Sequence, residues 1–394
     1  MAVRTQARVT AFRDDLEYYD DRAWGLLASA GDGTEGAVAA FERWEAPMTH
    51  AGARDVLAHE HGFSSWTELG RHLGSRRASD QPFIRAYRAI EAQDVEGLRQ
   101  QLKRSPELVN ARGTNDNDLL GMAAATCDER LVGVLLEYGA DPARANVHGW
   151  TPLHQAAYSG LPHLAQMLLS AGAPVDLSAR GEGGTPLVIA LFWGKRETAD
   201  LLAERGLLPP NLRVAAGLGL TALIEELVSP DGILAPPAGA RRAYYRPHSG
   251  FPAWRPSNDP QEILDEALSW AARNDRLDAL ELLVSRGARV DADVYRGTAL
   301  AWASSCGHVT AVRRLLDLGA DPNARTTFGG PDHGEAATAL HLAAESSRLE
   351  VIRELLIAGA DPTIRDARHD HTPAGWAEYG GQEAARDLLR ESQK

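Results

Sequence analysis

One stretch recurs along this chain of 394 residues and limits what the chain can fold into. Residues 151–176 read TPLHQAAYSGLPHLAQMLLSAGAPVD. Pro152 suits a first helical turn because it has no N–H to lose there, and Gly160 ends that helix. A second apolar run with helical spacing follows and ends at Gly172. The stretch therefore predicts a helix–turn–helix unit that is stopped by a glycine.

The same pattern returns at a nearly constant interval. Thr185-Pro186-Leu187 begins 34 residues after Thr151, and Thr338 and Thr372 open two further copies 34 residues apart. The matching ends are Gly139-Ala140-Asp141, Gly287-Ala288, Gly319-Ala320-Asp321 and Gly359-Ala360-Asp361. A period near 33 with T-P-L-H at the start and G-A-D at the end resembles the ankyrin repeat.

This resemblance implies an all-α fold, an ankyrin-repeat solenoid of helix–turn–helix units with hairpin loops. Aligning the copies predicts about nine repeats, whose inner helices start near residues 85, 118, 151, 185, 211, 266, 298, 338 and 372. The resemblance further implies that His154 and His341, the fourth residues of their motifs, form hydrogen bonds between repeats. We expect the array to occupy residues 81–394, interrupted by an insertion at 230–260.

Residues 1–80 do not follow the repeat. Residues 53–69, ARDVLAHEHGFSSWTEL, resemble an element that precedes ankyrin arrays in some bacterial proteins. A solenoid needs its end covered by an atypical segment, which predicts an N-terminal helical capping region. We expect Phe63 and Trp66 to pack onto the first repeat.

Charge and composition exclude several classes of function. The net charge of −13 argues against a nucleic-acid partner, since phosphate binding needs a dense Lys/Arg face. No leader and no apolar run near the roughly 18 residues of a membrane span is evident, which predicts a cytoplasmic protein without a membrane partner. Cys127 and Cys306 are the only cysteines, and no cofactor or metal motif occurs, so we predict neither a cofactor nor a metal.

The insertion at 230–260 is unlike the repeats. It contains seven prolines, and its charge is about +2 from four arginines against Asp231 and Asp259. A loop this long inside a compact array is either disordered or functional. We interpret it as a lid over the concave groove, and we expect deletion of 238–256 to leave the repeats folded because no repeat core is predicted there.

By the resemblance, the two residues before each helix-ending glycine lie on the concave side. Among these positions, Tyr158 and Glu345 carry acid–base chemistry, and the middle of the groove is apolar and aromatic. The candidate catalytic set is Tyr158, His248 and Glu345. The candidate ligand-binding residues are Phe192, Trp193, Leu218, Arg273, Asn274, Tyr244, Tyr245, Arg246 and Trp254.

Two hypotheses for function follow. In the first, the insertion closes the groove around an apolar small molecule, with a cofactor-free acid–base reaction of the lyase or cyclase type as an extension. The alternative is a non-catalytic scaffold that binds a protein partner, which is what the resemblance implies for most such arrays. We favour the first because the departures from the repeat are aromatic, basic and clustered in one place.

Overall fold

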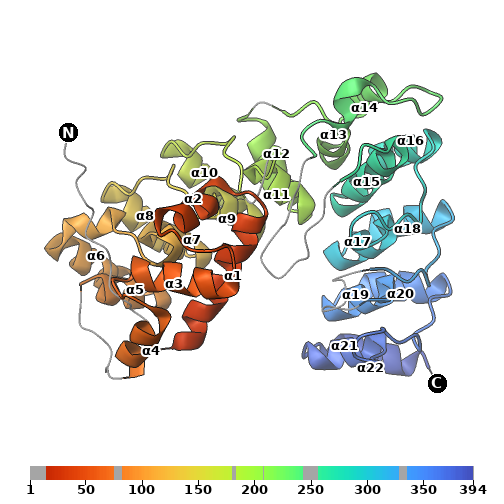
Figure 1. The fold of residues 1–394 in the computed structure, drawn as a ribbon. Helices are drawn as coiled ribbons and strands as arrows, with labels where there is room; N and C mark the ends of the chain where they lie inside the picture. Colours follow the sequence, from red (N-terminus) through yellow and green to blue (C-terminus); the bar gives the residue numbers. More distant parts are fainter. Residues whose placement is uncertain are drawn as a thin grey trace. The chain divides into compact units, whose positions relative to one another are not determined.

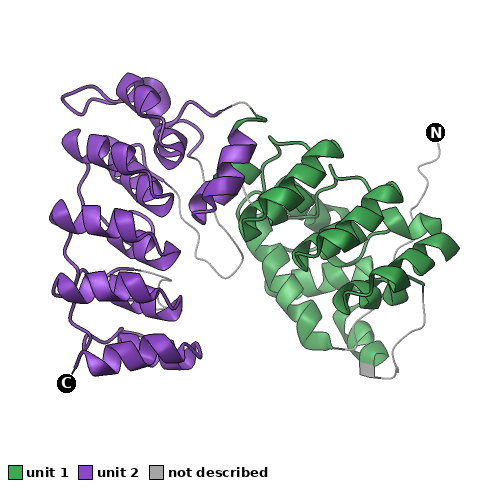
Figure 2. Cartoon of the chain, turned by 180° about the vertical axis from the view of Figure 1, so that it is seen from behind, with its two compact units in different colours: residues 1–189, 204–206, 244–250 green, residues 190–203, 207–243, 251–394 purple. Residues whose placement is uncertain are grey.

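The computed structural model describes residues 15–74, 82–179, 183–206, 208–242, 256–327 and 335–393 (Figure 1). These residues form helices joined by turns, and within the same ranges the only β pairing is three isolated bridges. None of the helices described has the length and apolar character that a bilayer crossing requires. The chain divides into two compact units, with the boundary inside the helix Pro186–Phe192 (Figure 2).

Nine helix pairs follow one another in the described part of the chain, as the repeat predicts. In the N-terminal unit they are α5 (Pro82–Glu91) with α6 (Val95–Arg104), α7 (Leu119–Ala125) with α8 (Glu129–Glu137), and α9 (Pro152–Ser159) with α10 (Pro162–Ser170). Short 3₁₀ turns, η1 (Pro106–Asn110) and η2 (Thr114–Asp116), lie between the first two pairs.

The other six pairs, apart from the start of α11, belong to the C-terminal unit, where one apolar core runs from Leu212 to Leu389. Figure 1 shows α15/α16 to α21/α22 stacked in order. The pairs are α11 (Pro186–Phe192) with α12 (Arg196–Ala203), α13 (Leu212–Leu218) with α14 (Thr221–Leu227), α15 (Pro260–Arg273) with α16 (Leu277–Ser285), α17 (Ala299–Cys306) with α18 (Val309–Asp317), α19 (Ala339–Glu345) with α20 (Leu349–Ile357), and α21 (Pro373–Tyr379) with α22 (Glu383–Glu391).

The repeated T-x-x-H motif closes the first turn of its helix and reaches the next repeat. At the start of α9, the Thr151 hydroxyl accepts the His154 backbone N–H, and His154 Nδ1 accepts the Thr151 N–H at 3.1 Å. His154 Nε2 then donates to the Gly184 carbonyl at 3.1 Å. His341 makes the same pair of bonds, to Thr338 and to the His371 carbonyl. The expected bonding of both histidines between repeats is therefore confirmed.

Residues 15–74, the described part of the N-terminal segment, fold into four helices of their own. They are α1 (Leu16–Gly31), α2 (Glu35–Arg43), α3 (His50–Glu60) and α4 (Trp66–Gly74). Phe63 and Trp66 pack within this segment, against the buried Tyr19 and Leu69, rather than onto the first repeat as expected. The G-F turn aims them at α1 because the Phe63 N–H and carbonyl bond back to α3.

Instead, the N-terminal helices contact the hairpins of the first repeats. Val147, at a hairpin tip, is 4% exposed and belongs to the same apolar core as Leu26 and Phe41. Two histidines add polar contacts, since His148 bonds to Ser29 at 2.7 Å and His61 bonds to Thr114 at 2.9 Å. The helices thus cover hairpin tips.

Both ends of the 230–260 insertion are built into the C-terminal unit. The turn η3 (Pro236–Gly239) brings Ala238, which is fully buried, into the apolar core. Arg242, 2% exposed, bonds to Glu266 of α15 and donates to the Ser257 carbonyl at 2.9 Å. The expectation that 238–256 can be deleted without disturbing the fold is therefore wrong, because the deletion removes buried core and a buried ion pair.

Candidate binding pocket on the N-terminal unit

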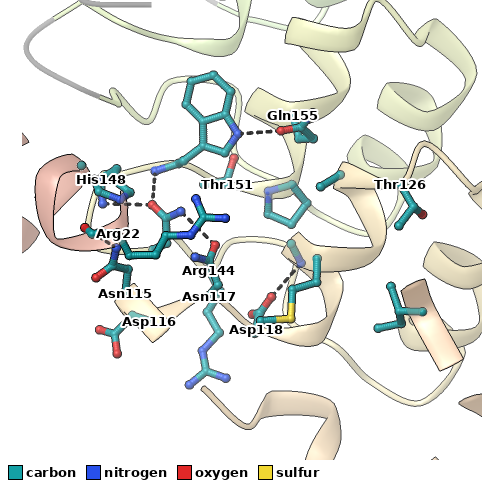
Figure 3. Close-up of a pocket in the computed structure, with 18 of the residues that line it drawn as sticks. Arg22, Asn115, Asp116, Asn117, Asp118, Thr126, Arg144, His148, Thr151 and Gln155 are labelled. Atoms are coloured by element: carbon teal, nitrogen blue, oxygen red, sulfur yellow. Dashed lines mark hydrogen bonds between the residues drawn. The ribbon is translucent and has the colours of Figure 1, made fainter. Parts of the chain in front are cut away.

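A pocket of about 460 Å³ lies between α1 and the hairpin side of the first three helix pairs. Figure 3 shows the side chains on its wall. Among the residues that the structure describes, four Tyr and Trp side chains line it: Tyr18, Tyr87, Trp150 and Tyr158. Four carboxylates and two arginines of the same described ranges line it as well: Asp21, Glu91, Asp116, Asp118, Arg22 and Arg144.

The hairpin between α8 and α9 fixes the tryptophan of the wall. Asn146 Oδ1 accepts the backbone N–H of His148 at 2.9 Å and that of Trp150 at 3.1 Å. The Trp150 indole N–H donates to Gln155 at 3.3 Å, and its ring meets Tyr158 edge to face at 6.2 Å. This wall is therefore held by α9 and its hairpin before any ligand arrives.

The hairpin before α7 supplies the polar end of the pocket. Asn115 and Asp116 both have left-handed backbone, with φ of 54° and 59°, which is a costly conformation for two successive non-glycine residues. Tertiary bonds hold the turn in place, because the Asn115 amide donates to the Arg22 carbonyl at 3.3 Å and its own carbonyl accepts the Val147 N–H at 3.1 Å.

Asp118 links this hairpin to α7. It is the N-cap, and its Oδ1 accepts the Gly121 backbone N–H at 2.8 Å. Its side chain is only 5% exposed, and this burial raises the pKa of the carboxyl. A positive charge brought close to Asp118 would therefore be stabilised more strongly than one at an exposed carboxylate.

Of the residues predicted for the site, Tyr158 lines this pocket, beside the concave positions Ala125 and Thr126 of the preceding repeat. Glu345 ends α19 in the C-terminal unit, where the surrounding protein desolvates its carboxyl and raises its pKa. His248, Tyr244, Tyr245, Arg246 and Trp254 lie outside the described residues. The convergence of Tyr158, His248 and Glu345 stays a prediction.

Of the other predicted ligand-binding residues, Arg273, Asn274 and Phe192 make contacts between helix pairs of the C-terminal unit. The Arg273 guanidinium, on a side chain 1% exposed, lies 3.6 Å from the ring centroid of Trp302 and 4.3 Å from that of Phe192. Trp193 meets Phe192 edge to face at 5.1 Å, and Leu218 is 8% exposed. A ligand role for these residues stays a prediction, and their observed partners are protein groups.

Gly217 explains why α11 and α15 meet although α13 lies between them in sequence. Asn274 is fully buried and its amide donates to the Leu191 carbonyl at 2.8 Å. A Cβ added at Gly217 would lie 3.1 Å from Leu191 and 3.5 Å from the Asn274 amide. The absence of a side chain at Gly217 therefore leaves room for this contact, at a position that the repeat pattern places on the concave side.

We expect Gly217→Leu to lower the free energy of unfolding by about 1–3 kcal/mol, the usual cost of overpacking a core. Urea denaturation of the purified chain measures this change. Leu223→Ile, at a partly buried position of α14, serves as a volume-matched control and should change stability by less than about 1.5 kcal/mol. Equal stability of Gly217→Leu and the wild type would contradict the packing described.

Sequence reasoning missed the contribution of α1 and η2 to the pocket. Tyr18, Asp21 and Arg22 belong to a segment that was expected to cap the end of the array. Their run of acidic and aromatic residues, DDLEYYDD at 14–21, was visible, but its position over the hairpins depends on tertiary contacts.

Comparison with known protein families agrees with this architecture. The family "Ankyrin repeats (3 copies)" matches residues 87–179, 120–213 and 252–326, and "Ankyrin repeat" matches 337–367. Together these segments cover more than half of the chain. The chain belongs to the ankyrin-repeat family. Ankyrin repeats indicate a protein–protein interaction scaffold.

Curated proteins similar to this one come from distant organisms. Protein PhlB of Serratia liquefaciens is 31% identical over 109 residues, which are 28% of this chain and 47% of that protein. The B-cell lymphoma 3 protein homolog of Mus musculus is 29% identical over 206 residues, 51% of this chain and 36% of that protein. The ankyrin repeat protein nuc-2 of Neurospora crassa is 27% identical over 220 residues, 53% and 18% respectively. The chain spans less than half the length of each.

Proposed function

We propose that this ankyrin-repeat protein is a scaffold that binds a protein partner and that the pocket of the N-terminal unit receives a segment of that partner. The observation that carries the proposal is the wall of aromatic side chains, with Trp150 and Tyr158 held in place by α9 and its hairpin. Rigid aromatic side chains in a concave site are the usual centres of binding energy in protein interfaces. A preformed wall also loses little conformational entropy on binding.

A small molecule in the groove is the second candidate. In this hypothesis the 230–260 insertion closes the groove over an apolar ligand, and Tyr158, His248 and Glu345 perform acid–base chemistry on it. The pocket volume of about 460 Å³ supports it, since small-molecule sites range from about 300 to 1,000 Å³. The four carboxylates in the lining count against an apolar ligand, because covering them without a partner is costly.

A photo-crosslinker at the pocket separates the two candidates. With p-benzoylphenylalanine in place of Tyr158, irradiation of cells that express the chain should yield a polypeptide adduct. The matched control carries the same group in place of Tyr379, which is 91% exposed on α21 and is not among the residues that line the pocket. The second candidate would be favoured by two results together. The adduct would form at both positions or at neither, and mass spectrometry would detect a small molecule released when the protein is denatured.

Once the adduct identifies the partner, Trp150→Ala should weaken its binding about 30-fold or more, the loss of ~2 kcal/mol expected for a hot-spot residue. Isothermal titration calorimetry with the purified partner measures the change. Tyr379→Ala, which removes an exposed ring elsewhere, should leave the affinity unchanged. Unchanged affinity in both Trp150→Ala and Tyr158→Ala would show that the partner binds another surface.

A further inference from the structure

We infer that the pocket of the N-terminal unit recognises a positively charged side chain, a lysine or an arginine of the partner polypeptide. This inference rests on the proposed function and specifies the chemistry of the same site. Three independent features of the lining support it: its charge, a buried acceptor, and the arrangement of its aromatic rings.

The lining carries an excess of negative charge. Among the described residues of the lining, Asp21, Glu91, Asp116 and Asp118 stand against Arg22 and Arg144, a difference of two charges. Arg112, which is not among these residues, pairs with Asp116 at 3.0 Å, so the excess rests mainly on the other three carboxylates. Both lining arginines already contact protein groups. The Arg22 guanidinium lies over the Tyr18 ring at 5.0 Å, and Arg144 donates to the Asn110 carbonyl. A cation entering the pocket therefore meets carboxylates, while an anion would be repelled by four of them.

A buried acceptor in the lining requires a donor. Asn115 is fully buried, and its amide nitrogen is used by the Arg22 carbonyl. Its Oδ1 has no hydrogen-bond partner among the residues that the structure describes. Leaving such an oxygen unpaired costs about 1–3 kcal/mol, so a ligand that brings an N–H group to it is favoured. Ammonium and guanidinium groups carry only donors.

Asp118, the carboxylate that caps the helix after this turn, is similarly suited to a cation. Asp118 follows Asn115 by three residues and lines the same pocket. It accepts one backbone N–H, from Gly121, and it is almost fully buried. Burial raises the pKa of its carboxyl, and a neighbouring cation would lower that pKa again while it is bound.

The aromatic rings provide the remaining contacts. Trp150 and Tyr158 stand edge to face, and a tryptophan face is the best of the natural rings for binding a cation. The protein already uses this contact at the rim, where α1 places Arg22 over Tyr18. Carboxylates, an unpaired carbonyl oxygen and aromatic rings together recognise an alkylammonium or a guanidinium group.

Four blocked amino acids test the inference on the full chain by ligand-observed NMR. N-acetyl-arginine amide and N-acetyl-lysine amide should bind, whereas the norleucine and glutamate analogues should bind at least about tenfold more weakly. Asp118→Asn should reduce binding of the cationic probes about tenfold or more, and it keeps an N-cap because asparagine caps helices as well as aspartate does. Asp176→Asn, an exposed change of the same charge outside the lining, should have no effect.

If Asp118→Asn does not fold, Asp21→Asn combined with Glu91→Gln removes two exposed carboxylates of the same lining and should weaken the cationic probes similarly. Equal binding of the norleucine or glutamate probe, or binding that none of these variants weakens, overturns the inference. If a polypeptide adduct forms at Tyr158 while the cationic probes do not bind, this inference fails and the scaffold stands. If the cationic probes bind but no polypeptide adduct forms, the scaffold proposal fails and the ligand is a free amine.

Discussion

Glu266→Gln is expected to lower the free energy of unfolding of the C-terminal unit by about 3–5 kcal/mol, the usual cost of removing one partner from a buried ion pair. Glu266 lies on α15 and is 2% exposed. Its carboxylate bonds to the Arg242 guanidinium and lies 3.5 Å from Arg213 Nη1. Both arginines are as buried as the glutamate, so the neutral variant removes a nearby negative charge from each, and Arg242 keeps its bond to Glu262.

Urea denaturation, followed by far-UV circular dichroism, measures this loss. The matched control is Glu225→Gln, since Glu225 is 60% exposed and lies 3.8 Å from Arg286. An exposed ion pair contributes between 0 and about 1 kcal/mol, so the control should differ little from the wild type. A Glu266→Gln protein as stable as the control would mean that water or another acidic group compensates the two arginines.

Acid is expected to destabilise both units through the histidines of the T-x-x-H motifs. Burial lowers the pKa of His154 and that of His341 to about 4. In each histidine, Nδ1 accepts a hydrogen bond from a backbone N–H. A proton added to Nδ1 would break that bond and place two donors against each other. The unfolded chain takes up these protons near pH 6.5, whereas the folded chain does not until about pH 4.

The stability that the neutral histidines contribute is therefore complete above pH 6.5 and is lost as the pH falls from 6.5 toward 4. Between pH 7.5 and pH 5 we expect each unit to lose about 2 kcal/mol from its histidine. Denaturant titrations at the two pH values measure this. The double variant His154→Gln, His341→Gln should be less stable at pH 7.5 but should lose less on acidification. His163→Gln, on a side chain 75% exposed, should behave as the wild type does. An unaltered pH dependence in the double variant would assign acid sensitivity to carboxylates instead.

The repeat pattern alone predicts most of the helices. Inner helices expected near 118, 151, 185, 211, 298, 338 and 372 start within one residue of those positions, because capping side chains and prolines fix helix starts locally. The helix expected near 85 starts at Pro82. The helix expected near 266 starts at Pro260 instead. Asp259 caps it and Pro260 suits its first turn, but both lie in a proline-rich stretch that was assigned to the insertion.

The candidate site was less predictable, for reasons of tertiary contact. Tyr158 was identified because its position in the repeat places it on the concave side. Its neighbours on α1 depend on which surface the N-terminal helices cover, and periodicity carries no information about that. Similarly, the repeat pattern predicts that Phe192 and Arg273 are groove residues. In the structure they contact each other, because Gly217 has no side chain and leaves room for α11 to meet α15.

The contact between Arg242 and the Ser257 carbonyl has a practical consequence, since Glu262 also bonds to both residues. Residues 242 and 257 lie within reach of one arginine side chain. The two ends of any polypeptide inserted between these residues would therefore be held close together, as are the ends of a domain inserted into a tight turn. This position is therefore a suitable insertion site, where a reporter protein or a foreign binding loop could be inserted without disturbing the packing of the helix pairs.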